Sequence, residues 1–223
     1  MTDSTSARID RMNEHYTFDL TQGVRRTTVT FRNHFGIELA GDLYTPAGAA
    51  AAGNQAIAIS GPFGAVKEQS SGFYANQMAA RGYIALAFDP SYTGESGGEP
   101  RYMNSPDINT EDFMAAVDYL STRETIDPGK IGIIGICGWG GMALNAAAID
   151  TRIKATVAST MYDMSRVTAN GYFDKANSSA ARHEARKALM AQRIEDFKAV
   201  QAGGTYKLGG GVVDPLPEDA PIL

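Results

Sequence analysis

The sequence has little of what would mark several classes of protein. A single cysteine stands among 223 residues, so no disulfide can form within the chain, and we expect a cytoplasmic location. Lys and Arg number 20 against 25 Asp and Glu, and the net charge of -5 argues against binding to nucleic acid or to an anionic membrane. No apolar run approaches the roughly 20 residues of a membrane-spanning helix, and residues 1–22 carry charge where a signal peptide is apolar.

Two further features that the sequence lacks exclude other classes of protein and of binding site. The 24 glycines follow no repeat period, which excludes a collagen-like or low-complexity chain. No group of His, Cys, Asp and Glu has the spacing of metal ligands, and no phosphate loop is complete, so we expect neither a metal nor a cofactor. The remaining composition, 43% hydrophobic and 20% charged, is that of an ordinary globular protein.

Four apolar stretches of strand length predict the centre of the fold. They alternate with helical patterns over residues 70–80, 107–122 and 142–149. We expect Ser70 or Ser71 to cap the first helix and Asp107 or Asn109 to cap the second. Strands that are apolar throughout, separated by helices, are typical of parallel βαβ units with helices on both faces. We therefore predict an α/β fold with a doubly wound, mostly parallel sheet. Its buried strands cover residues 55–60, 83–88, 130–137 and 153–159.

The regions on either side of these strands differ in pattern. Residues 24–44 alternate around a turn and predict an antiparallel hairpin, preceded by a polar arm over residues 1–22. Residues 161–223 show helices without intervening strands and then a Gly- and Pro-rich tail, which we interpret as a helical cap over the sheet. The α/β core over residues 23–160 would then lack its C-terminal strands, and the strand at 153–159 would be an edge open to pairing.

The segment Gly135-Ile-Cys-Gly-Trp-Gly-Gly141 carries the predicted chemistry. A sharp turn from strand to helix lifts Cys137 clear of the sheet, the Gly138 N–H helps to hold an oxyanion, and the helix N-terminus favours the thiolate. Trp139 stands two residues after Cys137, where the motif has a small residue. If the motif is instead aligned one residue later, the nucleophile position falls on Gly138, which has no side chain, so we retain Cys137 as the nucleophile. The alternative is a buried core thiol.

The second oxyanion donor is expected in the turn after the first central strand, at the N–H of Phe63 or Gly64. The alternative is a plain turn between strand and helix. Tyr92, Trp139 and Tyr162 follow strand ends, where substrates bind in such sheets, and are candidates for contact with a small acyl substrate. For the loop around Tyr92 a rigid structure held by Asp89 hydrogen bonds is an equal alternative.

Three motifs together resemble a known family: Gly61–Gln69 (G-P-F-G-A-V-K-E-Q), Phe88–Gly98 (F-D-P-S-Y-T-G-E-S-G-G) and Gly135–Gly141. The chain resembles the dienelactone-hydrolase-like branch of the α/β-hydrolase superfamily, from about residue 26 onward. The resemblance implies a hydrolase of an ester, lactone or thioester that forms an acyl-enzyme on Cys137. That branch has a Glu where this chain has Gly61, so its mode of thiol control is not carried over, and Glu68 is expected to be solvated or salt-bridged.

The same resemblance implies an acid and a His that follow the nucleophile. His15 lies in the arm, His34 in the hairpin turn, and His183 on a cap helix, and none falls at the family's position; His183 is the least implausible alternative. We therefore expect that the acid and the His come from a missing C-terminal segment, or from a second chain or homo-oligomer that completes the sheet. The alternative is a non-catalytic, truncated or split subunit that acts in assembly.

Overall fold

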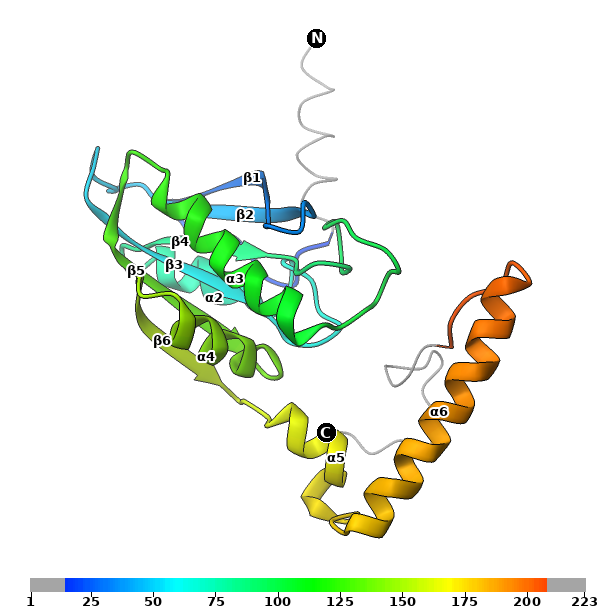
Figure 1. Cartoon of the computed structure of the whole chain (residues 1–223). Coiled ribbons are helices and arrows are strands. Elements are labelled where there is room, and N and C mark those ends of the chain that lie inside the picture. Colours follow the sequence, from blue (N-terminus) through cyan, green and yellow to red (C-terminus); the bar gives the residue numbers. More distant parts are fainter. Residues whose placement is uncertain (1–14, 208–223) are drawn as a thin grey trace. The chain divides into compact units, whose positions relative to one another are not determined.

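The computed structural model describes residues 15–207, and it divides the chain into two units, Met1–Asp163 and Met164–Leu223 (Figure 1). The first unit is built around a sheet of six strands in the order β1-β2-β4-β3-β5-β6. β1 pairs with β2 and β2 with β4 in the antiparallel sense, whereas the remaining neighbours are parallel. The predicted α/β sheet with an N-terminal hairpin is confirmed. The strands are β1 (Val24–Arg32), β2 (Glu38–Pro46), β3 (Asn54–Ser60), β4 (Ile84–Phe88), β5 (Ile126–Ile136) and β6 (Ile153–Ser159).

Helices cover both faces of this sheet, with α3 (Pro106–Ser121) and α4 (Trp139–Ile149) on one face and α2 (Ser70–Ala79) on the other (Figure 1). Each face has its own apolar core, because strand residues that are buried on both sides alternate between the two. Phe113 of α3 packs with Phe88 on the first face, and Ala75 of α2 belongs to the core on the second face. The sheet therefore holds two cores back to back.

The helix starts differ from the sequence expectations. The Ser105 hydroxyl, and neither Asp107 nor Asn109, caps α3, where Pro106 occupies the first helical turn. The Asn109 side chain instead accepts the Ser105 N–H at 2.9 Å. Gln69 precedes α2 without a side-chain cap, so the expectation for Ser70 or Ser71 is wrong. α4 begins at Trp139, three residues earlier than the pattern of small residues suggested, so Trp139 opens the helix that follows Cys137.

The last strand, β6, corrects one prediction. None of its seven residues is buried, and Val157 is 51% exposed, although an apolar buried strand was expected. The reason is its place in the sheet: β5 is its one neighbour, and no strand follows it within the part of the chain that the structure describes. The expectation of an open edge at this strand is confirmed.

The described part of the N-terminal arm, residues 15–22, is attached to the first unit. The Tyr16 hydroxyl donates to the Asp42 carboxylate at 2.6 Å, and the Thr21 N–H donates to the Asn76 side chain at 3.1 Å. The Phe18 ring packs edge-on against Phe73 of α2. Residues 1–14 lie outside the described range.

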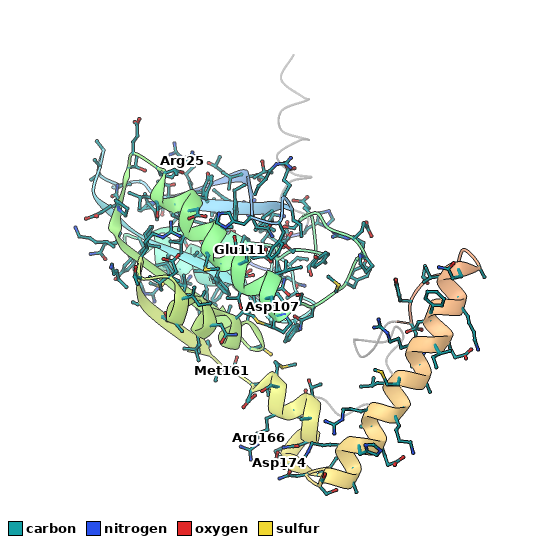
Figure 2. The ribbon with its side chains drawn as sticks, viewed as in Figure 1. Arg25, Asp107, Glu111, Met161, Arg166 and Asp174 are labelled. Carbon is teal, nitrogen blue, oxygen red and sulfur yellow. The ribbon has the colours of Figure 1, made fainter. Side chains whose placement is uncertain are left out.

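The second unit contains α5 (Met164–Asn170), a short 3-10 helix (Tyr172–Asp174) and α6 (Ser179–Gln201). Figure 2 shows Arg166 and Asp174 beside each other at the turn of this unit, where they form an ion pair. Most large apolar side chains of α6 are exposed within the unit, Phe197 at 63% among them. That this unit caps the sheet stays a prediction, and the predicted tail lies largely outside the described residues. Among the described helices, none is both long and apolar enough to cross a membrane.

Candidate active site

Cys137 occupies the turn between β5 and α4 in a strained conformation. Its φ of 57° lies in the left-handed region, which costs a residue with a Cβ on the order of 1–3 kcal/mol and persists only where the surroundings enforce it. Two backbone hydrogen bonds do so: the Cys137 N–H donates to Ser159 O at 2.8 Å, and the Gly140 N–H donates to Cys137 O at 3.0 Å. The sharp turn that the motif predicted at this position is therefore present.

Glycines on either side of Cys137 allow the strand and the helix to pass closely. A Cβ on Gly135 would lie 2.3 Å from the Trp139 carbonyl oxygen, and one on Gly140 would lie 2.9 Å from the Met161 side chain. The glycine required after the cysteine is thus at position 140, where the helix passes the end of β6, and not at 139. This explains how the large Trp139 fits at a position where the motif usually has a small residue.

The turn at residues 61–64 lies directly against this elbow. A Cβ on Gly138 would fall 1.7 Å from Cε2 of Phe63, so the Phe63 ring rests on the Gly138 α-carbon. The Phe63 and Trp139 rings meet edge to face at 4.6 Å. Gly61 has a φ of 102°, and a Cβ there would lie 2.4 Å from Ile136 O. The sequence-predicted donors Gly138 and Phe63 are therefore neighbours.

Three backbone N–H groups at this junction have no acceptor among the described residues. Within residues 15–207, no acceptor is found for the N–H of Gly138, of Phe63 or of Gly64. Gly138 stands at the N-terminus of α4, where free N–H groups and the helix dipole favour negative charge. The arrangement is chemically suited to a developing oxyanion, and that role of the three residues stays a prediction.

A cavity of about 320 Å³ opens beside the junction. Residues 62–66 form one wall, the loop after β4 forms another through Pro90, Thr93, Gly94 and residues 101–104, and Trp139 contributes to the lining. Tyr92 and Tyr162 do not line it. Tyr92 is 5% exposed with its ring against Gly98, which agrees with the rigid-loop interpretation, and Tyr162 is 42% exposed beyond the end of β6.

An ionic cluster around the buried Lys67, beside this cavity in the chain, was missed by sequence reasoning. The Lys67 ammonium, 1% exposed, lies 2.5 Å from Glu68, 2.6 Å from Glu95 and 3.5 Å from Asp89. Burial acts to lower the pKa of Lys67, but the attraction of Asp89 and the hydrogen bonds to Glu68 and Glu95 outweigh it and raise that pKa. The salt-bridged interpretation of Glu68 and the Asp89-held loop are both confirmed. A usable signal was present, because all four residues belong to the first two motifs.

Within residues 15–163, the described part of the first unit, no hydrogen bond or ion pair joins the Cys137 thiol to a His or a carboxylate. His34 instead pairs with Glu111 of α3, at 3.2 Å. His15 is exposed in the arm, and His183 is exposed on α6 of the second unit. Ser159, whose carbonyl accepts the Cys137 N–H, has its hydroxyl 3.2 Å from the hydroxyl of Tyr74, and Tyr74 and Cys137 pack against the same core. Among the described residues, no group of three or more His, Cys, Asp or Glu side chains is arranged to hold a metal ion.

Comparison with known proteins agrees with the fold. The uncharacterized protein PA2218 of Pseudomonas aeruginosa is 62% identical over 158 residues, which are 71% of this chain and 43% of that protein. Its crystal structure matches with a TM-score of 0.79 at 52% identity, over 89% of this chain and 63% of that one. The thiohydrolase aneE of Aspergillus aculeatus is 34% identical over 129 residues, which are 58% of this chain and 39% of that protein. This chain therefore spans less than half the length of either curated relative.

The α/β hydrolase GrgF of Penicillium matches with a TM-score of 0.65 at 23% identity, over 81% of this chain and 56% of that one, which bears on the fold alone. The predicted superfamily is confirmed, whereas the dienelactone-hydrolase-like branch stays a prediction. A family model described as X-Pro dipeptidyl-peptidase (S15 family) matches residues 36–204. Since that match spans the sheet from β2 onward, the elbow and α6, the chain belongs to the S15 family, with an α/β-hydrolase fold.

Proposed function

We propose that this chain is the nucleophile-bearing part of a Cys-dependent hydrolase that cleaves an ester, lactone or thioester through an acyl-enzyme. The observation that carries the proposal is the strained backbone of Cys137, whose φ is 57° directly before α4, beside the N–H groups of Gly138 and Phe63, which have no acceptor within residues 15–207. A strained residue between a strand and a helix is the arrangement by which α/β-hydrolases present their nucleophile. The dienelactone-hydrolase-like assignment belongs to this proposal.

The chemistry follows from this geometry. The Cys137 thiolate adds to the carbonyl carbon, and the carbonyl electron pair moves to its oxygen, which accepts hydrogen bonds from the N–H groups of Gly138 and Phe63. Collapse of this intermediate expels an alcohol or a thiol, which takes up the proton that a base removed from the Cys137 thiol. Water that has lost a proton to the same base then attacks the acyl-enzyme, releases a carboxylic acid and regenerates the thiol.

The names of relatives support acyl transfer as the reaction class. One relative is named a thiohydrolase and another a polyketide transferase, and both reactions move an acyl group. The S15 family is named for a peptidase, in which the same addition to a carbonyl is made on an amide. We favour an ester, lactone or thioester because a thiolate is the nucleophile, and an alcohol or thiol leaves more readily than an amine.

In this proposal the base and the acid come from a further segment or a partner chain that completes the sheet. The edge of β6 is open, and beside it an apolar depression of about 280 Å³ lies on the face of the sheet, lined in part by Ile57, Met78, Ile134 and Val157. A strand paired with β6 and a helix packed on this depression would bury both surfaces. The curated relatives PA2218 and aneE are longer than this chain, and more than half of each lies outside its match to this chain.

The open edge also favours a second candidate, a non-catalytic subunit that acts in assembly. The two functions differ in the fate of Cys137. Incubation with a p-nitrophenyl ester followed by intact-mass measurement should show one acyl group on the wild-type protein, and none on Cys137→Ala. Absence of acylation on the wild type, both alone and mixed with the part of PA2218 that lies outside its match to this chain, would leave the assembly role.

A further inference from the structure

Lys67 is the most deeply buried cation in the described structure, and it serves no step of the mechanism above. Its ammonium is shared by the carboxylates of Glu68, Asp89 and Glu95. We call these four residues the Lys67 clamp. The ammonium and the Asp89 carboxylate are fully buried, Glu68 is largely buried, and the Glu95 side chain is 67% exposed. Burial of such a group of charges is costly unless its geometry is tightly held.

Backbone hydrogen bonds show what the clamp holds. One oxygen of Asp89 accepts the Lys67 N–H at 2.7 Å, and the other accepts the Glu95 N–H at 2.9 Å. The close approach of the Asp89 carboxylate to the loop requires a glycine at position 94, because a Cβ there would lie 2.3 Å from that carboxylate. The segment at residues 61–67 and the loop after β4 are therefore joined through main chain and side chains alike.

These two segments are the walls of the cavity beside the elbow. Phe63 and Val66 belong to the first wall, and Thr93 and Gly94 to the second. Phe63 stands four residues before Lys67 in the chain, and its ring rests on Gly138 and Trp139. Any movement of Lys67 relative to Asp89 would thus be passed to the turn that carries the Phe63 N–H.

We propose that Lys67 is a positioning residue that keeps the turn at residues 61–64 in register with the Cys137 elbow by binding the loop after β4. This proposal rests on the proposed function, since it assigns Lys67 a part in placing the oxyanion donors. A charged clamp differs from an apolar contact in one respect. Removal of the cation leaves three carboxylates that repel one another, so the two walls separate instead of closing on the gap.

The sequence supplies a reporter for this register. Trp139 is the single tryptophan of the chain, and its ring contacts Phe63 of the turn. Its emission and its quenching by acrylamide therefore report the packing of the turn without any turnover. The rate at which an activated ester acylates Cys137 reports the oxyanion donors, whereas alkylation by iodoacetamide needs the thiolate alone.

The test compares Lys67→Met with Lys67→Arg, which keeps the charge, and with Lys130→Met as the matched control. Lys130 is a half-exposed lysine that pairs with Asp127 at 3.1 Å, far from the clamp in the sequence. We expect Lys67→Met to lower the acylation rate by about 100-fold, the usual effect of a misplaced or lost oxyanion donor. Trp139 quenching should rise, and alkylation should stay within about twofold because the thiolate is untouched. Lys67→Arg should recover much of the acylation rate.

A second pair of variants covers the case in which Lys67→Met does not fold. Glu95→Ala removes one carboxylate whose side chain is 67% exposed, and Glu99→Ala is its control on the same exposed loop. Glu95→Ala should change acylation and quenching in the same direction as Lys67→Met, by a smaller factor, and Glu99→Ala should change neither. The proposal is overturned if folded Lys67→Met, or Glu95→Ala, matches its control in both readouts. If wild type is not acylated but quenching responds as expected, the clamp stands and the proposed function fails.

Discussion

Gly138→Ala gives the sharpest test of how the elbow and the turn at residues 61–64 fit together. The backbone of Gly138, with φ -59° and ψ -28°, is helical and accepts alanine without strain. On backbone grounds alone the substitution should stabilise the protein by roughly 0.4–1 kcal/mol, because alanine loses less conformational freedom on folding than glycine. The packing opposes this, since the new Cβ would lie 1.7 Å from Cε2 of Phe63.

Carbon atoms pack at roughly 3.5–4.0 Å, so the Phe63 ring must withdraw by about 2 Å. Its edge-to-face contact with Trp139, worth about 0.5–1.5 kcal/mol, would be lost together with part of the burial of a half-buried ring. We expect a net destabilisation of about 1–2 kcal/mol, which is in the range for overpacked sites. We also expect the acylation rate of Cys137 to fall by about 100-fold, because the Phe63 N–H moves with its ring.

Urea unfolding followed by Trp139 emission measures the first effect in the unit that contains the elbow. Gly141→Ala is the control: it lies on the same helix with nothing within 4 Å of the new Cβ, and it should stabilise by about 1 kcal/mol without slowing acylation. Gly138→Ala with Phe63→Ala removes the clash and should recover stability relative to Phe63→Ala alone. The reasoning fails if Gly138→Ala is as stable as Gly141→Ala and is acylated at the wild-type rate.

Three further outcomes are expected. Asp112→Asn should lower the free energy of unfolding in urea by about 3–5 kcal/mol. This fully buried carboxylate accepts four hydrogen bonds, and the NH2 group of asparagine would face donors where one carboxylate oxygen accepts now. Ser178→Ala removes the hydroxyl that accepts the Ala181 N–H at 3.1 Å at the start of α6, and thermal unfolding of the helix by circular dichroism should show a loss of about 1 kcal/mol. Hydrogen bonds from Arg166 lower the pKa of Asp174 to about 2, so its stabilising contribution is present above the ordinary value of 3.8 and disappears as the pH falls to about 2. An acid titration should show that loss, and Asp174→Asn should abolish it; a titration identical to wild type would contradict the assignment.

The strands of the sheet were predictable because each is a short apolar run between helical patterns, and burial on both faces requires nothing else of a strand. The exposure of β6 was not predictable from its residues, because it depends on whether another strand lies beside it. Ile153 and Val157 have the side chains of a central strand, and in the described structure they belong to an edge. The cap of α3 was missed although Ser105 precedes Pro106, a pair typical of a helix start.

The elbow was predictable for a different reason. Cys137 and its glycines are adjacent in sequence, so a local motif contains the whole backbone turn. The Lys67 clamp joins residues up to 28 positions apart, and pairing over such a distance has no local pattern. The fit of Trp139 likewise could not be predicted from the sequence. The close approach that requires Gly140 is made with Met161, which lies beyond the end of a different strand.

The placement of Cys137 and the open edge of the sheet are physically connected. The strained φ of Cys137 is held in part by its N–H bond to Ser159, the last residue of β6. β6 is an edge strand without a buried residue, and such a strand opens locally at low free energy. The strain at Cys137 is therefore held in part by a weakly protected strand. Any element that pairs with β6 would tighten that strand and, through Ser159, the elbow itself. In the proposed function the complement would then do two things at once: it would supply the base that activates the Cys137 thiol, and it would hold the nucleophile in the geometry in which that base can act.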